Sequence, residues 1–297
     1  MGYMLAGIKV AMLGGDQREF VLLKELLSLG ANVQACGLPK LELQEGYQHY
    51  DNPVEAVKGV NVIILPVRGV NTEGQIYTPD NQQKFYFNEK LIKSIPAGTV
   101  ILVGVANSFL KELAATYGWQ LTETANLDEM AVLNSVPTAE GAIMIAMQKL
   151  PVTLHGSEAF VLGLGRVGFT LARMLDGLGA RVTVIDRGKA DRARANTEGW
   201  AAYSFNDMPS VINKADVIFN TVPHQVLTKS ILANTKPEVV IIDLASAPGG
   251  TDFYAAETLK RQSVLALGLP GKVAPKTAGL ILARIYPSLI MKCMERQ

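Results

Sequence analysis

The sequence contains only two cysteines, Cys36 and Cys293, and they lie far apart in the chain. This scarcity argues against a disulfide framework or a zinc site, and it favours a reducing compartment. No uninterrupted apolar run is long enough to cross a membrane. The first ten residues contain a single lysine and resemble the approach to a strand more than a signal peptide. We therefore expect a cytoplasmic protein without a metal site.

An excess of charge of one sign is also missing. The 28 basic and 27 acidic residues give a formal net charge of +1, and no long basic run is present. This balance argues against nucleic acid or an anionic membrane as the main partner. The chain also lacks the GxSxG and HExxH patterns of common hydrolases. Its 297 residues, 48% of them hydrophobic, are enough for two domains with sizeable cores.

The most informative stretch runs from Glu158 to Gly168. A short apolar segment ends in Gly163-Leu164-Gly165-Arg166-Val167-Gly168, and a helical pattern of apolar residues follows at once. In this context the first glycine permits a tight turn, the second leaves room for a pyrophosphate, and the third lets the helix pack close to the strand. Free N–H groups at the helix start would meet the phosphates. The pattern predicts a dinucleotide-binding turn.

The residues after the next strand bear on which dinucleotide binds. A strand expected at Arg181–Ile185 delivers Asp186 to the ribose position, 23 residues after Gly163. Asp186 suits the free ribose hydroxyls of NAD, whereas Arg187, with Lys189, suits the 2′-phosphate of NADP. Both cofactors stay open at this point. A later strand end carries Thr221-Val222-Pro223, which we place near the nicotinamide.

The N-terminal half shows a similar alternation of strands and helices. Strands are expected at Ile8–Leu13, Asn32–Cys36, Val60–Leu65 and Thr99–Val103, which indicates a parallel sheet with crossover helices. Its first turn is Gly14-Gly15-Asp16, so we expect the fold without the dinucleotide. The predicted class is α/β, with two Rossmann-like doubly wound parallel-sheet domains joined by interdomain helices and a cleft between them. Expected bounds are 1–126 for the substrate domain, 127–150 for an interdomain helix, 151–276 for the NAD(P)-binding domain, and 277–297 for a helix that packs back on the first domain.

Substrate-binding residues are expected at strand ends and helix starts. The connections 66–87, with Arg68, and 104–108, with Asn107, are either substrate loops or plain surface loops. Two similar segments, Val136-Pro-Thr-Ala-Glu-Gly141 and Ala274-Pro-Lys-Thr-Ala-Gly279, predict helices that begin at Pro137 and Pro275. If these starts face the cleft, Thr138 and Thr277 would mark two carboxylate sites. The alternative is that Pro and Thr simply start helices well.

Few residues are candidates for acid–base chemistry. His224, one of three histidines, follows a strand end near the expected nicotinamide, although a capping or surface role is the alternative. Lys276 could neutralise a carboxylate or transfer a proton. Glu140 is expected in the first turn of its helix, where a carboxylate is also favoured by the helix dipole. Ser246 and Thr251 are possible donors to substrate or local caps of a glycine-rich turn.

Four stretches together resemble the A-subunit family of dipicolinate synthase, the dehydrogenase-like component of that enzyme in spore-forming bacteria. They are Asn134-Ser135-Val-Pro-Thr-Ala-Glu-Gly141, the Gly163–Gly168 turn, Asp243-Leu-Ala-Ser246 with Pro248-Gly-Gly-Thr-Asp-Phe253, and Gly268-Leu-Pro-Gly-Lys-Val-Ala-Pro-Lys-Thr-Ala-Gly279. The last of these is the most specific. The likeness extends over nearly the whole chain.

The resemblance implies oxidation of a dihydro- or hydroxytetrahydrodipicolinate of the lysine pathway to dipicolinate during sporulation. It implies NADP as cofactor, the flavoprotein-like B subunit of dipicolinate synthase for a partner, and the mother cell as location. A ring with two carboxylates would need two anion clamps, for which Thr138, Thr277, Lys276 and Arg68 are candidates, and Ser135 lies in a matching stretch. Glu140 and His224 remain contenders for the base. Rival hypotheses are a 2-hydroxyacid-dehydrogenase-like enzyme and a non-catalytic NADP-binding scaffold protein.

Overall fold

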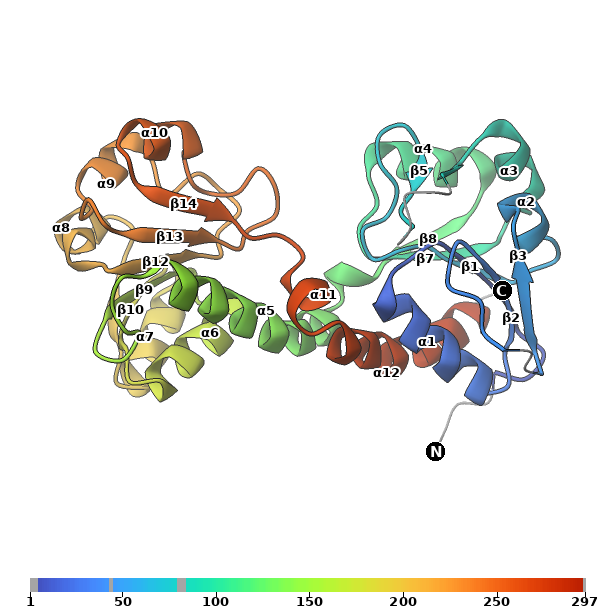
Figure 1. Cartoon of the computed structure of the whole chain (residues 1–297), viewed down its shortest axis with the longest axis horizontal. Helices are drawn as coiled ribbons and strands as arrows, with labels where there is room; N and C mark the ends of the chain where they lie inside the picture. The colour runs from blue at the N-terminus through green and yellow to red at the C-terminus, as the bar shows by residue number, and fades with distance from the viewer. Residues whose placement is uncertain (1–4, 43–44, 79–83, 296–297) are drawn as a thin grey trace. The chain divides into compact units, whose positions relative to one another are not determined.

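A computed structural model describes residues 5–42, 45–78 and 84–295 of the chain. The chain divides into two compact units (Figure 1). Unit 1 comprises Met1–Ala131 and Pro275–Gln297, and unit 2 comprises Val132–Ala274. Each unit contains a six-stranded sheet in which all neighbouring strands are parallel. The predicted class, two doubly wound α/β domains, is confirmed.

The sheet of unit 1 has the strand order β3-β2-β1-β4-β7-β8. Its strands are β1 (Lys9–Leu13), β2 (Asn32–Cys36), β3 (Tyr47–Tyr50), β4 (Val62–Ile64), β7 (Val100–Val103) and β8 (Gln120–Glu123). The helices of this unit are α1 (Gln17–Ser28), α2 (Pro53–Ala56), α3 (Glu89–Ser94), α4 (Ser108–Tyr117), the 3-10 turn η1 (Thr124–Asn126) and α12 (Pro275–Met294). The order reverses between β1 and β4, which is where open α/β sheets bind ligands.

Successive side chains of β1 point to opposite faces of the sheet and are buried on both. Ala11 and Leu13 belong to the cluster that packs under α2, α3 and α4. Met12 is equally buried and, by the period of a strand, faces the other way. Helices α1 and α12 pack along each other in this unit. Gly279 permits that approach, because a Cβ there would lie 2.7 Å from the Cβ of Val21.

The connection 66–87 is not a plain loop. It contains an antiparallel pair, β5 (Gln75–Ile76) and β6 (Phe85–Tyr86). Residues 79–83 of this connection lie outside the described part of the chain. The short strands have no periodic pattern long enough to be predicted from sequence.

The sheet of unit 2 has the order β11-β10-β9-β12-β13-β14, which repeats the order of unit 1. Its strands are β9 (Glu158–Leu162), β10 (Arg181–Ile185), β11 (Ala201–Tyr203), β12 (Val217–Asn220), β13 (Val240–Asp243) and β14 (Gln262–Leu265). Its helices are α6 (Arg166–Gly177), α7 (Lys189–Thr197), α8 (Met208–Val211), η2 (Ile212–Lys214), α9 (Lys229–Ala233), α10 (Phe253–Thr258) and α11 (Leu269–Val273). Helix α5 (Asp128–Lys149) begins in unit 1 and continues into unit 2.

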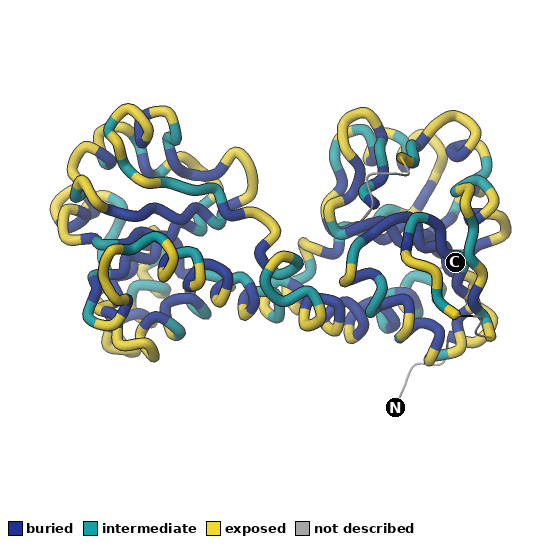
Figure 2. Tube along the Cα trace, viewed as in Figure 1, coloured by how far each residue is buried: buried dark blue, intermediate teal, exposed yellow. Residues whose placement is uncertain are grey.

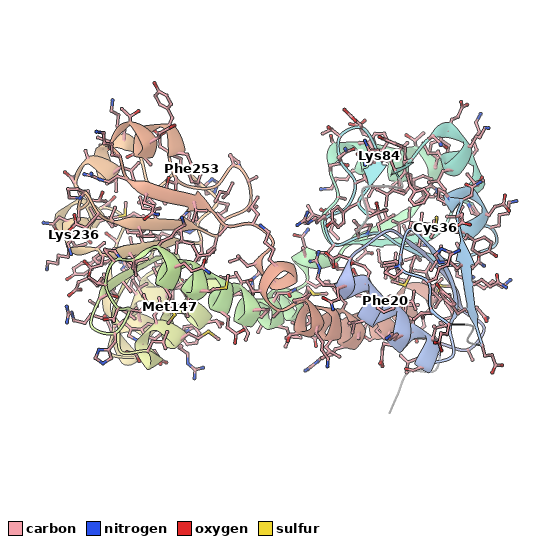
Figure 3. All side chains as sticks on the ribbon, viewed as in Figure 1. Phe20, Cys36, Lys84, Met147, Lys236 and Phe253 are labelled. Atoms are coloured by element: carbon pink, nitrogen blue, oxygen red, sulfur yellow. The ribbon has the colours of Figure 1, made fainter. Side chains whose placement is uncertain are left out.

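Both faces of the second sheet are covered. Ala159 and Val161 of β9 join a core with residues of α5 and α6, whereas Phe160 and Leu162 join a core with residues of α8, α9 and α10. Strands β12 and β13 are accordingly buried throughout, and β9 is buried from Ala159 to Leu162 (Figure 2). Outside these cores, Lys236 (Figure 3) pairs with the carboxylate that precedes β12. This burial fixes the register of the strands and hence the position of their carboxyl ends.

The prediction that a helix begins at Pro137 is wrong. Helix α5 starts nine residues earlier and runs through the proline. Hydroxyls on both sides of Pro137 donate to carbonyls of the preceding turn, from Ser135 to Val132 at 2.6 Å and from Thr138 to Asn134 at 2.7 Å. Neither bond reaches the carbonyl of Leu133, which is the usual helical acceptor for the N–H that Pro137 lacks. The predicted start of α12 at Pro275 is confirmed, and Pro287 lies inside that helix.

Helices α5 and α12 are long and apolar enough to span a bilayer, with mean hydropathies of 1.3 and 1.2 over their windows. Length and composition alone are weak evidence, because core helices of folded domains have the same properties. In α12 the face formed by Ile281, Ile285 and Tyr286 is buried in unit 1. Helix α12 is therefore a core helix of an α/β unit.

Candidate functional site

The glycine-rich turn of unit 2 joins β9 to α6. Gly163 has a φ of +86°, and a Cβ on Gly168 would lie 1.9 Å from the Gly163 carbonyl oxygen, so both positions require glycine. At Gly165, in contrast, a Cβ would meet no atom within 4 Å. The protein itself therefore does not explain the second glycine, whereas a bound pyrophosphate does.

The start of α6 is suited to an anion. Gly165 is its N-cap and supplies no side-chain cap, so the first N–H groups of the helix are not used by a capping side chain. Leu164 is buried, Val167 is half-buried, and Arg166 is exposed on the first helical residue. The fit of these residues to the phosphates of a dinucleotide is good.

Asp186 follows β10 and holds the glycine-rich turn in place. Its Oδ2 accepts the N–H of Leu164 at 2.8 Å, and its Oδ1 accepts the N–H of Gly188 at 2.6 Å. The residue is only 8% exposed. Asp186 therefore lies beside the glycine-rich turn with both oxygens engaged by backbone donors, and its contact with a ribose stays a prediction.

Basic side chains surround the same strand end. Arg187 is exposed and Lys189, the first residue of α7, is exposed as well. Nη1 of Arg192 donates to the carbonyls of Asp186 at 2.7 Å and of Arg187 at 2.9 Å. This interaction, which sequence analysis missed, fixes the backbone of the segment that carries Arg187.

The end of β12 contacts the glycine-rich turn. Oγ1 of Thr221 donates to the carbonyls of Leu162 at 2.9 Å and Gly163 at 3.2 Å. The fully buried Asn220 closes the next turn by bonding to both the N–H and the carbonyl of Val222. Pro223 and His224 then follow as exposed residues. The structure thus places Thr221 in contact with the glycine-rich turn, and the position of residues 221–223 near a nicotinamide stays a prediction.

The end of β13 is organised by a carboxylate that sequence analysis missed. Asp243 is fully buried and accepts the N–H groups of Ala245 and Gly250 and the hydroxyl of Thr251, the last at 2.6 Å. The Thr251 hydroxyl therefore stabilises this loop. This corresponds to the alternative in which Thr251 is a local cap and not a donor to substrate. Ser246 is exposed in the same loop.

The predicted carboxylate site at Thr138 is not a helix start. Ser135 is buried and its hydroxyl is shared with that of Thr170 on α6 at 2.7 Å, so it joins the two helices. Glu140 is exposed in the interior of α5 and is not in a first turn, which corrects that expectation. Gly141 packs against α11, since a Cβ there would lie 3.0 Å from Leu269.

Lys276 and Thr277 lie in the first turn of α12, and both are exposed. The two similar Pro-Thr segments therefore do not form a pair of helix starts. What they share structurally is a glycine that lets another helix approach, Gly141 in one and Gly279 in the other. The similarity of sequence reflects packing.

In unit 1 the place of a pyrophosphate is filled by the chain itself. The N–H of Gly15 donates to the carbonyl of Tyr77 at 3.0 Å, and a Cβ on Gly14 would lie 2.2 Å from that oxygen. Asp16 and Glu19 form a capping box at the start of α1. The N–H groups that would hold a phosphate are thus occupied, so this turn is not a second dinucleotide site.

Two ionisable residues at this turn, Arg18 and Glu19, escaped the sequence analysis, although the D-x-x-E spacing from Asp16 to Glu19 was visible. The carboxylate of Glu19 accepts the N–H of Asp16 at 2.7 Å and that of Val67 at 2.8 Å. Burial raises the pKa of Glu19 to about 7, although nearby Arg18 opposes the rise. Arg18 is bidentate to Asp16, with Nε–Oδ1 and Nη2–Oδ2 distances of 2.9 and 2.8 Å.

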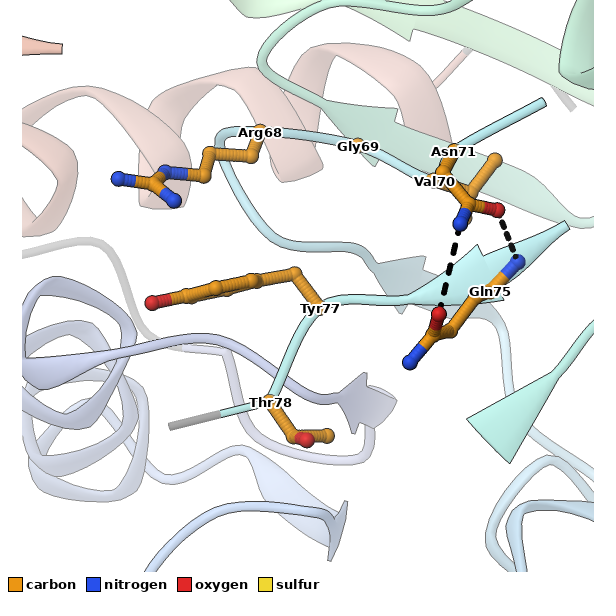
Figure 4. Close-up of a pocket in the computed structure, with 7 residues that line it drawn as sticks. All are labelled: Arg68, Gly69, Val70, Asn71, Gln75, Tyr77 and Thr78. Carbon is orange, nitrogen blue, oxygen red and sulfur yellow. Dashed lines mark hydrogen bonds between the residues drawn. The ribbon is translucent and has the colours of Figure 1, made fainter. Parts of the chain in front are cut away.

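A pocket of about 320 Å³ lies beside this turn. It is lined by Arg68, Gly69, Val70, Asn71, Gln75, Tyr77 and Thr78 (Figure 4). Asn107 caps α4, and its amide donates to the carbonyls of Val70 and Asn71 at 3.0 Å. Asn107 therefore fixes the backbone of Val70 and Asn71, which line the pocket, without lining it itself. The Arg68 side chain, in contrast, lines the pocket.

Among the residues that the structure describes, no group of three or more His, Cys, Asp or Glu side chains could hold a metal ion.

Two family models match separate parts of the chain. Residues 9–125 match the N-terminal domain of the dipicolinate synthase A subunit, and residues 137–269 match the NAD binding domain of D-isomer specific 2-hydroxyacid dehydrogenases. The chain is 36% identical over 295 residues to the dipicolinate synthase A subunit of Bacillus subtilis (strain 168), covering 99% of each chain.

Solved structures of two relatives superpose on the chain. The A subunit of dipicolinate synthase from Bacillus subtilis gives a TM-score of 0.92 at 36% identity and covers 100% of both chains. Its counterpart from Bacillus halodurans gives 0.91 at 35% identity and covers 97% of this chain and 99% of the other. The glycine-rich turn thus lies in an NAD-binding domain, and the protein is an NAD(P)-dependent oxidoreductase that belongs to the A-subunit family of dipicolinate synthase.

Proposed function

We propose that this protein oxidises a dihydrodipicolinate or 4-hydroxytetrahydrodipicolinate to dipicolinate as the dehydrogenase component of a two-subunit enzyme. The observation that carries the proposal is the difference between its two equivalent turns. The turn at Gly165 leaves space for a dinucleotide, and the turn at Gly14 is closed by Tyr77. Unit 2 would bind the cofactor, and unit 1, with its basic pocket, would bind the ring substrate. The family resemblance supplies the identity of that ring.

Oxidation of the dihydro ring removes one hydride and one proton from it. A bound nicotinamide dinucleotide would accept a hydride from a ring carbon, and a base would remove one proton, which leaves the aromatic pyridine. The hydroxytetrahydro precursor would lose water first. The chain would align the reactants and stabilise the two ring carboxylates with basic groups.

His224, Glu140 and Lys276 are the candidates for the base. His224 is favoured by position, because it follows the 220–222 turn that touches the glycine-rich turn. Glu140 and Lys276 lie on exposed helix surfaces. Substrate contacts are proposed for Arg68, with Ser246 and Thr277 as further candidates, whereas the hydroxyls of Ser135 and Thr138 are engaged by other groups of the chain.

We favour NADP as the cofactor. Both oxygens of Asp186 accept backbone N–H groups, so the carboxylate is less available to ribose hydroxyls than the bare motif suggests. The exposed Arg187 and Lys189 would bind the 2′-phosphate. The flavoprotein-like B subunit is the proposed partner, and the mother cell of a sporulating bacterium is the proposed place.

The test follows NADP reduction by its absorbance with the ring precursor present, with and without the B subunit. Gly165→Ala adds a methyl group in open space, so its thermal stability should match the wild type while NADP binding and turnover fall at least about tenfold. Gly177→Ala is the matched control, because its Cβ also meets nothing within 4 Å. Unchanged NADP affinity in Gly165→Ala, or no NADP reduction under either condition, would contradict the proposal.

A further inference from the structure

Two guanidinium groups of unit 1 interact with Tyr77, one over its ring and one electrostatically. The guanidinium carbon of Arg68 lies 4.7 Å from the centre of the Tyr77 ring (Figure 4), a distance at which the ring attracts the cation. Both residues line the pocket. The Tyr77 ring therefore holds the Arg68 side chain in one position. Without this contact, the long side chain would sample many rotamers.

The position of Tyr77 is in turn fixed by the backbone. Its carbonyl accepts the N–H of Gly15, as described above. On the other side, the Asn71 carboxamide bonds to the N–H and side chain of Gln75 at 2.8 and 3.4 Å (Figure 4). The pocket wall that carries the ring is thus anchored at both ends of the segment from Gln75 to Tyr77.

Arg18 is the second cation. Its side chain is 8% exposed, and Asp16 takes two of its donors, at Nε and Nη2. Within residues 5–42, 45–78 and 84–295, Nη1 of Arg18 has no hydrogen-bond acceptor. This nitrogen is not sealed in the core, because the buried unpaired side-chain atoms of the described chain are the indole nitrogens of Trp119 and Trp200.

Arg18 also interacts electrostatically with Tyr77. Burial lowers the pKa of the Arg18 guanidinium, but Asp16, Glu19 and Tyr77 together outweigh this effect and raise it, so the group stays charged. One guanidinium thus lies over the ring of Tyr77 and another within electrostatic range of its hydroxyl. An almost buried guanidinium with an unused edge is a site for an oxyanion. Gly15, three residues before Arg18, bonds to the carbonyl of Tyr77, which lines the pocket.

We infer that Arg18 and Arg68, arranged around Tyr77, form the carboxylate-binding site of unit 1. The ligand class is a small planar ring with two carboxylates, and the inference rests on the proposed function. Backbone recognition of phosphate is excluded at this turn, because Tyr77, Asp16 and Glu19 occupy the relevant N–H groups. An anionic ligand at this turn would therefore be bound by guanidinium groups, which bind planar carboxylates in a bidentate manner. Tyr77 is a positioning residue for Arg68.

The experiment uses the full chain and isothermal titration with pyridine-2,6-dicarboxylate. Arg68→Gln and Arg18→Lys should each weaken binding at least about tenfold, since each removes a charge-assisted or bidentate contact. Lys93→Gln, which removes an exposed charge on α3, is the matched control and should bind like the wild type. Because Arg18→Lys alters a buried pair, Arg68→Gln, which breaks no buried ion pair, keeps the test decisive if the former does not fold.

Tyr77 is tested by a pair of variants. Tyr77→Leu should raise KM for the ring substrate about five- to tenfold and leave kcat within about twofold, because the lost contact only positions Arg68. Tyr77→Phe keeps the ring and should recover most of the affinity. A general disturbance of the fold would lower kcat and NADP affinity as well, and that result would count against the positioning role.

The outcomes separate the site from the reaction. If the wild type binds the diacid through both arginines but does not reduce NADP, the proposed function is refuted and the proposed site stands. Turnover with unchanged diacid affinity in Arg68→Gln and Arg18→Lys refutes the site and retains the function. Pyridine-2-carboxylate should bind more weakly than the diacid. Equal binding of the two, equal competition by inorganic phosphate, or no binding of the diacid would overturn the inference.

Discussion

Replacing Glu19 by Gln should remove a large part of the pH dependence of the stability of unit 1. Glu19 is 2% exposed, and its burial raises its pKa from 4.5 to about 7. The folded state therefore holds a proton on this carboxyl between pH 4.5 and 7 that the unfolded state has lost. The stabilisation from this group is fully present below pH 4.5 and is lost as the pH rises through 7.

The magnitude follows from the two pKa values. At about 1.4 kcal/mol per pKa unit, the difference corresponds to about 3 kcal/mol in the free energy of unfolding, of which about 2–3 kcal/mol falls between about pH 5 and 8. Gln has no proton to lose. The Gln side chain has one acceptor oxygen for the two N–H groups of Asp16 and Val67. The substitution therefore lowers the free energy of unfolding by about 1–2 kcal/mol at every pH.

The assay can report on unit 1 alone. The chain has two tryptophans, Trp119 in unit 1 and Trp200 in unit 2, and both are buried. In a Trp200→Phe background, urea unfolding followed by fluorescence at about pH 5, 6, 7 and 8 reports the unit that contains Glu19. Glu89→Gln, on the exposed surface of α3, controls for the loss of one negative charge.

The expected result is a difference between wild type and Glu19→Gln that shrinks or reverses as the pH rises. Parallel curves would refute the reasoning, because they would mean that Glu19 has the same pKa in the folded and unfolded states. A wild type that gains stability over the variant with rising pH would place the pKa below 4.5, and its contacts with Arg18 would then outweigh burial.

Two further predictions concern unit 2. Arg187→Ala should raise the Kd for NADP about tenfold or more while changing the Kd for NAD less than about threefold, measured by titration of the nicotinamide fluorescence or by calorimetry; equal losses for both would exclude Arg187 from a 2′-phosphate site. Asp216→Asn should lower the free energy of unfolding by about 1 kcal/mol at about pH 7, since burial opposes but hydrogen bonds with Lys236 and the N–H of Glu158 lower the pKa of Asp216. That stabilisation is present above pH 3.8 and lost as the pH falls through the lowered pKa, so a deficit that persists at about pH 2 would count against it.

The cofactor turn could be predicted because its signal is local. Gly163, Gly168 and Asp186 are set by the geometry of one strand, one turn and the next strand, all within 24 residues. The positions of β2 and β10 were predicted to the residue because runs of alternating polar and apolar residues between glycines define them. Short edge strands such as β3 and β11 lack such runs, and their pairing depends on the sheet already being in place.

The site in unit 1 could not be predicted because it depends on distant contacts. The bond from Gly15 to Tyr77 crosses about sixty residues of chain, and that from Val67 to Glu19 crosses 48. No pattern in the sequence reports which carbonyl closes a turn. The error at Pro137 has another origin, because the helix already begins at Asp128 and continues through a residue that normally begins one.

The two units share one topology but differ at the turn that ends the first strand of each sheet. Both sheets have the same strand order, and in both the first strand ends in a glycine turn that leads to a helix. At Gly165 the helix start has no side-chain cap, which leaves N–H groups for a phosphate. At Gly15 and Asp16 the corresponding donors are used by a carbonyl and a capping box, so an anion can be held there only by side chains. Arginines on that turn and on the neighbouring connection are therefore what the altered turn requires for a carboxylate ligand, and their loss should affect the ring substrate without affecting the dinucleotide.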